Sequence, residues 1–332
     1  MKNIINILVL IFFANSLYAK TIHIGHQQKI KSIQQALLVA VDKDTLLVDA
    51  GHYHEKNIVI HKSIFLIGLN HPVLDGDNKY EIISIKANAV VVDGFKIIHS
   101  GISSIEDYAG IKIYSSRDVV IRNNILEDTF FGIYTQYGTN CTIEKNTLTS
   151  YSKEEQQSGN GIHCWKADSM RIIANNISGH RDGIYFEFVT HSIIWRNISE
   201  KNLRYGLHFM FSNNDSYISN IFTNNGAGVA VMFSNHVKMI NNYFEENWGD
   251  GAYGLLLKEI SDSYIENNRF IKNTIGIFME GASRILLEKN PPAMILFRSL
   301  MTSLLDKTEK VLPSLTPENL KDEHPLMKPL PL

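Results

Sequence analysis

Two methionines and one histidine lie at spacings that could bind a soft metal ion. Met210 and Met232 are 22 residues apart, and His208 precedes Met210 by two residues. Thioether and imidazole groups suit Cu(I) better than Mg²⁺ or Ca²⁺. Because the set is small and uncharged, we expect it to hold Cu(I) only transiently, with no tightly bound cofactor. The alternative is that both methionines are flexible apolar side chains at a protein interface.

These positions can be compared because the chain repeats. A Gly followed by an apolar residue recurs with spacings of 22, 29, 22, 23, 22, 26 and 22 residues, at Gly110, Gly132, Gly161, Gly183, Gly206, Gly228, Gly254 and Gly276. An Asn follows each Gly at a similar interval, at Asn124, Asn146, Asn176, Asn197, Asn220, Asn242, Asn268 and Asn290. Both markers lengthen at the same two places, which predicts loops inserted near 151–158 and 245–251.

The repeat predicts a solenoid of β-strands. Short alternating runs such as Ile111-Lys112-Ile113 are typical of strands rather than helices. One such coil buries too little surface to be stable alone, so the coils must stack. We therefore expect an all-β, right-handed, single-stranded parallel β-helix over residues 46–290. The Asn residues should form a side-chain ladder at one corner, because stacked coils place equivalent residues about 4.8 Å apart.

The two ends of the chain differ from the repeat. Residues 1–19 read as an export signal, with Lys2 before the apolar run Ile4–Phe13, and this predicts export from the cytosol. Residues 20–45 are predicted to cap the solenoid with a helix that begins after Ser32. Residues 291–332 are predicted to form an amphipathic helix over Ala293–Lys310 and a Pro-rich tail. That helix would either bind a partner or membrane surface, or cap the open end.

Positions within a coil follow from strand alternation. Counted from each Gly, positions +1 and +3 should face the core, and +2 and +4 should face outward. The outward positions carry aromatic, imidazole, thioether and charged groups where small polar residues would be ordinary, and such an exposed stripe marks a contact surface. The predicted partner contacts are His163, Trp165, Tyr185, Glu187 and Lys258.

The two cysteines are predicted to remain separate thiols. Cys164 occupies a +3 core position, and Cys141 occupies a core position of a different strand. A disulfide needs Cα atoms within about 7 Å, which different walls of a tube make improbable. The oxidising compartment of an exported protein would permit a disulfide, so the geometry rather than the compartment decides this prediction.

A carbohydrate-binding or polysaccharide-cleaving protein is the main alternative, and its candidate acids are Asp182, Glu187 and Glu280. A glycosidase needs two carboxyls about 5–10 Å apart, whereas Glu187 and Glu280 are four coils apart. We expect Asp182 to form a structural ion pair with Arg181. We therefore predict no catalytic residues and no enzymatic activity, and the low net charge of -2 argues against a nucleic-acid partner.

The chain resembles the NosD family in segments that the fold does not explain. They are the runs 180–187 (HRDGIYFE), 204–212 (RYGLHFMFS), 228–234 (GVAVMFS) and 253–259 (YGLLLKE), together with the tail from Asn290 to Leu320. The resemblance implies a periplasmic accessory of an ABC-type complex that assists nitrous oxide reductase maturation. The implied partners are a membrane permease, a cytoplasmic ATPase, and the reductase or a copper chaperone. One departure is that further coils usual in the family before this tail are missing.

Overall fold

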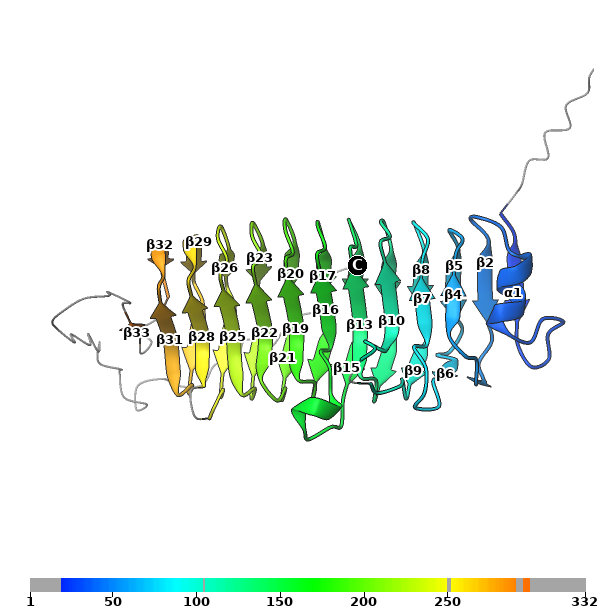
Figure 1. Ribbon diagram of the computed structural model, residues 1–332, viewed down its shortest axis with the longest axis horizontal. Helices are drawn as coiled ribbons and strands as arrows, with labels where there is room; N and C mark the ends of the chain where they lie inside the picture. The colour runs from blue at the N-terminus through cyan, green and yellow to red at the C-terminus, as the bar shows by residue number, and fades with distance from the viewer. Residues whose placement is uncertain (1–18, 104, 250–251, 291–294, 299–332) are drawn as a thin grey trace, which may run out of the picture.

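The chain folds into an elongated stack of parallel coils (Figure 1). The computed structural model describes residues 19–103, 105–249, 252–290 and 295–298. The signal peptide predicted over residues 1–19 lies outside these residues except for Ala19. Within the described residues, no helix is long and apolar enough to cross a bilayer.

Three parallel sheets form the walls of the solenoid. Sheet A contains β1 (Thr21–Ile24), β2 (Thr45–Val48), β5 (Phe65–Gly68), β8 (Val91–Asp93), β11 (Val120–Arg122), β14 (Thr142–Glu144), β17 (Arg171–Ile173), β20 (Ile193–Trp195), β23 (Ser216–Ile218), β26 (Lys238–Ile240), β29 (Ser261–Glu266) and β32 (Ser283–Glu288). Sheet B contains β3 (His52–Tyr53), β6 (Val73–Asp75), β9 (Lys96–Ile98), β12 (Ile125–Glu127), β15 (Thr147–Thr149), β18 (Asn176–Ser178), β21 (Ile198–Glu200), β24 (Ile221–Thr223), β27 (Tyr243–Glu245) and β30 (Arg269–Ile271).

Sheet C carries the residues of most functional interest. It contains β4 (Ile58–Ile60), β7 (Ile83–Ile85), β10 (Ala109–Tyr114), β13 (Phe131–Gln136), β16 (Ile162–Trp165), β19 (Asp182–Glu187), β22 (Tyr205–Met210), β25 (Ala227–Met232), β28 (Tyr253–Lys258), β31 (Ile275–Glu280) and β33 (Ile295–Arg298). Two short helices complete the described elements, α1 (Ile33–Val39) and the 3-10 helix η1 (Glu155–Gln157).

The core is one continuous apolar column inside the tube. The predicted +1 and +3 positions are buried there, for example Ile184 and Phe186 of β19 and Leu207 and Phe209 of β22. Neighbouring coils interlock, since the Phe186 and Phe209 rings meet edge to face with centroids 5.3 Å apart. Each such side chain contributes about 1.5–3 kcal/mol of transfer free energy on burial.

An Asn ladder runs along one corner, with one member displaced from the prediction. In each step an Asn side chain accepts from the backbone N–H and the side-chain amide of the preceding member, as Asn146 does from Asn124 at 3.0 and 3.1 Å. The member expected at Asn176 is Asn175, whereas Asn176 starts β18 and is exposed. With Asn175, the Asn spacings equal those of the glycines, because both mark fixed corners of the same coil.

The ends of the solenoid also differ from the predicted boundaries. Strand pairing begins at β1, which pairs with β2, so the range 20–45 already contributes to sheet A. The helix predicted over Ala293–Lys310 is wrong where the structure describes it, since Ile295–Arg298 forms β33 and pairs with β31. Without β33 the edge of β31 would be open, and its unpaired backbone groups favour the addition of a strand. Residues 299–310 lie outside the described residues.

Both cysteines are buried and unpaired, as predicted. Burial raises the pKa of each thiol above its usual value, so neither is a reactive thiolate at neutral pH.

Candidate functional site on the outer face of sheet C

Strand alternation decides which side chains of sheet C face outward, and a glycine at the start of each repeat allows neighbouring coils to approach closely. In β22, Leu207 and Phe209 enter the core, which turns His208 and Met210 outward. A Cβ at Gly206 would lie 2.7 Å from the Gly228 carbonyl oxygen and 2.9 Å from Phe222. Only glycine allows this close approach, which explains why it opens each repeat.

The +2 column of this face is a stack of rings from successive coils. Ring centroids are 4.5 Å apart for Tyr134 and His163, 4.8 Å for His163 and Tyr185, and 4.8 Å for Tyr185 and His208. Tyr205 flanks His208, also at 4.8 Å. His163 is 8% exposed and His208 is 6% exposed. The expectation of an exposed stripe is therefore wrong for this column, because large rings on stacked coils cover one another.

His163 is held as a neutral imidazole. Burial, together with the charge of Arg181, lowers the pKa of His163 to about 3. Its Nδ1 lies 3.2 Å from the amide nitrogen of Asn160. Its Nε2 and the Asn160 Oδ1 are both buried without a hydrogen-bond partner among the described residues. If the Asn160 amide turned by 180°, Oδ1 would accept from Nδ1–H and leave the Nε2 lone pair free.

Asp182 forms a buried ion pair with a different arginine from the one predicted. Arg204 donates from Nε to Oδ1 at 3.0 Å and from Nη2 to Oδ2 at 2.7 Å, whereas Arg181 was expected. His208 Nδ1 lies 3.6 Å from Oδ2, an ion-pair separation rather than a hydrogen bond. Burial raises the pKa of Asp182, but His208 and Arg204 outweigh it and hold the carboxyl below its usual value. Arg204 follows Asp182 by 22 residues, which is one coil.

The +4 column places the two methionines opposite each other. Met210 and Met232 are direct partners in the pairing of β22 with β25. Both are half-buried, and neither belongs to the apolar core. The hydroxyl of Tyr185 donates to the Met210 sulfur at 3.5 Å. The described contacts of the His208 ring are with Asp182, Tyr185 and Tyr205, so a site shared by His208 and the two sulfurs stays a prediction.

The remaining predicted contact residues occupy the same column. Trp165, Glu187 and Met210 are successive register partners, and all three are half-buried. Lys258 pairs with Met232 in register, and its ammonium lies 3.6 Å from the Glu280 carboxylate. Its charge is therefore partly neutralised rather than free for a partner.

An exposed aromatic column beside the +4 residues was missed. Phe188, Phe211 and Phe233 are 44%, 39% and 40% exposed, and their rings stack with centroids 5.1 Å apart at both steps. Each of them directly follows a residue of the +4 column, namely Glu187, Met210 or Met232. Their spacings of 23 and 22 residues match the repeat, which was the signal available in the sequence.

The residue types on this face fit a soft metal ion as transient cargo. Among the described residues, buried ring nitrogens of His163 and His208 without hydrogen-bond partners are potential metal donors, and the half-buried Met210 and Met232 offer two thioethers on the same face. Such ligands suit Cu(I). Carboxylates are few here and Asp182 is occupied by Arg204, so the face fits hard cations poorly.

Two family models match the chain. Residues 149–291 match the family described as periplasmic copper-binding protein (NosD), and residues 50–169 match the right-handed β-helix region. The segment 149–291 contains every residue of the face from His163 to Lys258. A comparison with curated proteins gave no match.

Several solved structures share the fold at low identity. The A-module of a mannuronan C-5 epimerase from Azotobacter vinelandii has a TM-score of 0.53 and 12% identity, over 81% of this chain and 90% of its own. DFA-IIIase from Arthrobacter chlorophenolicus A6 has a TM-score of 0.56 and 12% identity, over 73% and 83%. A mannuronic acid specific polysaccharide family 6 lyase from human gut microbiota has a TM-score of 0.56 and 10% identity, over 81% and 83%. These similarities show the fold alone.

Proposed function

We propose that this chain, a NosD-family right-handed β-helix protein, is a non-enzymatic periplasmic accessory that passes Cu(I) across the outer face of sheet C. Its partners would be the permease and ATPase of an ABC-type system, and nitrous oxide reductase or a copper chaperone. The observation that carries the proposal is the direct pairing of Met210 with Met232, within the family match, on a face where buried ring nitrogens of His163 and His208 have no hydrogen-bond partner among the described residues.

Each neighbour of the methionines has a part in this proposal. Tyr185 fixes the position of the Met210 sulfur through its hydroxyl. Asp182, which Arg204 holds in place, lies 3.6 Å from His208 Nδ1 and would orient the His208 ring. Two neutral thioethers give no charge to trap the ion, so Cu(I) would bind weakly enough to be released to a partner.

The exposed aromatic column supports docking of a protein partner beside the copper. Stacked, half-exposed rings such as Phe188, Phe211 and Phe233 are unusual on a surface without a partner, because each leaves apolar area in water. Glu187, which directly precedes Phe188, borders this region and would orient the partner by its charge.

The test is an anaerobic Cu(I) titration of the wild type against Met210→Leu combined with Met232→Leu. Leucine keeps the volume and apolarity of methionine but removes the sulfur. The matched control is Met239→Leu, because Met239 is buried in the core. The proposal expects Cu(I) affinity to fall in the double variant alone, and equal affinity in all three proteins would reject it.

A second candidate function is sugar processing, favoured by one observation. Tyr185, His208, Asp182 and Arg204, groups able to move protons or hold a carboxylate, lie together on the outer face of sheet C. Against it, Asp182 and His208 are almost wholly buried. Incubation with polymannuronate separates the two functions, because a sugar enzyme would yield unsaturated or epimerised products that Tyr185→Phe abolishes.

A further inference from the structure

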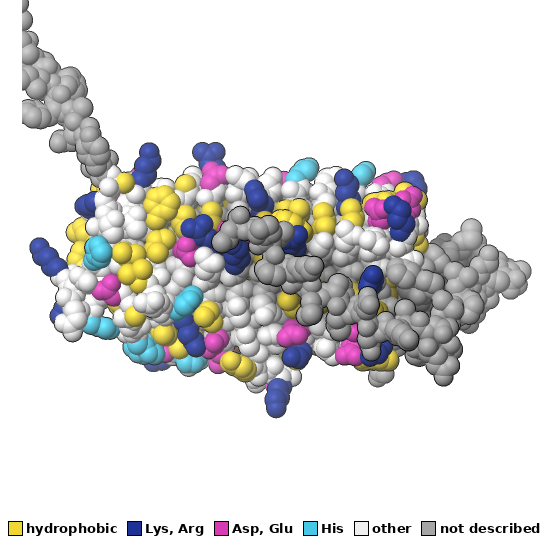
Figure 2. All heavy atoms as spheres, turned by 180° about the vertical axis from the view of Figure 1, so that it is seen from behind, with side chains coloured by type: hydrophobic (Ala, Val, Ile, Leu, Met, Phe, Trp, Pro, Cys, Tyr) yellow, Lys and Arg dark blue, Asp and Glu magenta, His cyan; other side chains and the backbone are white. Residues whose placement is uncertain are grey.

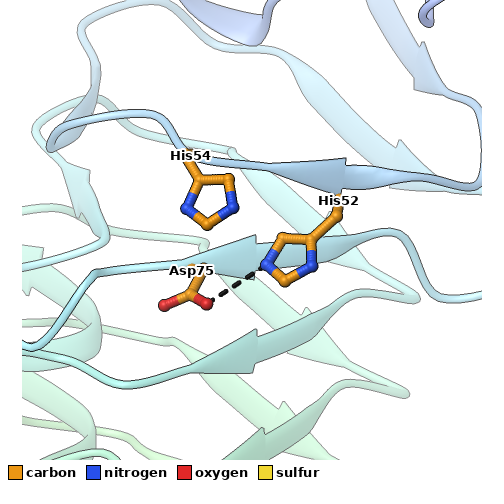
Figure 3. A group of neighbouring side chains, drawn as sticks. All are labelled: His52, His54 and Asp75. Carbon is orange, nitrogen blue, oxygen red and sulfur yellow. Dashed lines mark hydrogen bonds and ion pairs between the residues drawn. The ribbon is translucent and has the colours of Figure 1, made fainter.

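A second group of metal-ligand side chains lies on a different wall, near the N-terminal end. Among the residues that the structure describes, one group of three potential ligands is close enough to share an ion, namely His52, His54 and Asp75, with ligand atoms within 4.8 Å of one another. Figure 3 shows the three side chains converging from adjacent strands of sheet B. Imidazoles also gather at this end of the surface (Figure 2).

Strand alternation and register bring the three residues together. Tyr53 points into the core between His52 and His54, so both imidazoles lie on the outer face, with ring centroids 4.4 Å apart. β3 pairs with β6 so that Tyr53 lies opposite Leu74, which brings the next residues, His54 and Asp75, side by side.

Two of the three potential ligands, His54 and Asp75, are oriented by further groups, and His52 contacts Asp75 itself. His52 Nε2 lies 3.1 Å from Asp75 Oδ2, while Asp75 Oδ1 accepts from the Asp77 amide at 3.0 Å and lies 3.1 Å from His99 Nδ1. His54 Nδ1 lies 2.8 Å from Asp77 Oδ1, which leaves its other ring nitrogen available. Carboxylates that orient the far nitrogen of an imidazole are the usual outer partners of metal-binding histidines.

The ligand types and the spacing suit a divalent ion. Asp75 supplies a carboxylate oxygen and the two histidines supply imidazole nitrogens, ligand types that Zn²⁺ accepts. Imidazole and carboxylate ligands lie about 2.0–2.2 Å from Zn²⁺, so two ligands of one tetrahedral ion are about 3.3 Å apart. The 3.1 Å between His52 and Asp75 is close to that value.

We propose that His52, His54 and Asp75 bind one divalent transition-metal ion of the Zn²⁺ and Cu²⁺ class, with Asp77 and His99 as orienting residues. The histidine side chains are 50% and 55% exposed, so a coordination position stays open to water or to a donor from another molecule. The site lies outside 149–291 and uses hard and borderline ligands. It is therefore separate from the Cu(I) function proposed for sheet C and does not rest on it.

The competing explanation is that His52, Asp75 and His99 form only a hydrogen-bonded ladder. The experiment titrates the full chain with Zn²⁺, and separately with Cu²⁺, by calorimetry in a non-chelating buffer. The variants are His52→Gln with His54→Gln, and Asp75→Asn, which keeps the shape of the side chain and one acceptor oxygen but removes the charge. The control is His61→Gln, an exposed histidine after β4 outside the cluster. Cu²⁺-loaded samples are also examined by electron paramagnetic resonance for nitrogen coupling.

The proposal expects one ion per chain in the wild type and in the control. Both site variants should bind at least about 100-fold more weakly, since loss of an outer partner alone costs about 10- to 100-fold. It also expects nitrogen coupling that the double variant loses. Absence of binding in the wild type, equal binding in the site variants, or equal loss in the control would overturn it. Met210→Leu with Met232→Leu should bind these divalent ions as the wild type does, so the two proposals can fail independently.

Discussion

At the scale of single residues, the buried Asn ladder shows how one side chain satisfies several backbone groups. Asn175 accepts from the backbone and side-chain amides of Asn146, both at 3.0 Å, and donates to the Ile143 carbonyl at 2.9 Å. These groups are buried, so water cannot replace a lost partner, and each orphaned group costs about 1–3 kcal/mol.

The ladder provides a matched pair of adjacent asparagines. We expect Asn175→Ala to destabilise the protein by about 2–4 kcal/mol, because it removes the acceptor of the buried Asn146 backbone N–H and a donor to the Ile143 carbonyl. The exposed Asn176→Ala should change stability by no more than about 0.5 kcal/mol. Chemical denaturation followed by circular dichroism measures both. Equal destabilisation by the two substitutions would refute the assignment of Asn175 to the ladder.

Asp215 makes stability depend on pH in the opposite sense to an ordinary carboxylate. Burial raises its pKa to about 8, with a smaller contribution from Asp168, while the Ser192 amide opposes the increase. An unfolded Asp ionises near pH 4. Between about pH 4 and pH 8 the folded state therefore holds the extra proton, and stability falls as pH rises by up to about 1.4 kcal/mol per pH unit.

Asp215→Asn tests this dependence with little change of shape. The amide oxygen can still accept from the Ser192 N–H, which lies 2.7 Å from Asp215 Oδ1. We expect the variant to melt at a higher temperature than the wild type at pH 8, with the difference shrinking towards pH 4. A difference that stays constant across thermal melts from pH 4 to pH 8 would show that Asp215 does not titrate in this range.

At the scale of secondary-structure elements, β33 closes one side of the solenoid end. It pairs with β31 from Ile277–Ile295 to Glu280–Arg298 and so covers an edge of sheet C. Open edges of parallel sheets promote association between chains. This pairing favours a capping role for the segment, one of the two roles considered for the predicted helix.

Two deletions distinguish β33 from the rest of the tail. Removal of residues 295–332 should expose the edge of β31 and produce oligomers, whereas removal of 299–332 should leave the sheet edge covered. Sedimentation velocity reports the oligomeric state of both variants. Monomeric behaviour of the longer deletion, at the concentration where the shorter one is also monomeric, would remove the capping role from β33.

The strands of sheet C were predictable from the sequence, but their surroundings were not. Alternation correctly assigned Phe186 and Phe209 to the core and Met210 and Met232 to the outer face, since it depends only on local geometry. The burial of His208 depends on rings from neighbouring coils and was not foreseen. The helix predicted over Ala293–Lys310 is wrong at Ile295–Arg298 for a related reason, because a free sheet edge can pair with an apolar segment that has helical spacing.

At the scale of the whole molecule, the two proposed metal sites lie at different coils of the solenoid. Met210 and Met232 end β22 and β25 of sheet C, whereas Asp75 of the His52–His54–Asp75 group ends β6 of sheet B, among the early coils; Figure 1 labels these strands. The repeat positions follow from the Gly and Asn periods. The His52–His54–Asp75 group could not be predicted from the repeat, because its residues meet only through the register of β3 with β6 in two short, irregular coils.

The central claim is that Cu(I) binds through the methionine sulfurs of sheet C. Copper K-edge X-ray absorption of the full chain, loaded anaerobically with one equivalent of Cu(I), tests it most directly. The account predicts sulfur scattering in the wild type and in Cys141→Ala with Cys164→Ala, and its loss in Met210→Leu with Met232→Leu. A shell of nitrogen and oxygen alone in the wild type, or sulfur that disappears with the cysteines, would contradict it.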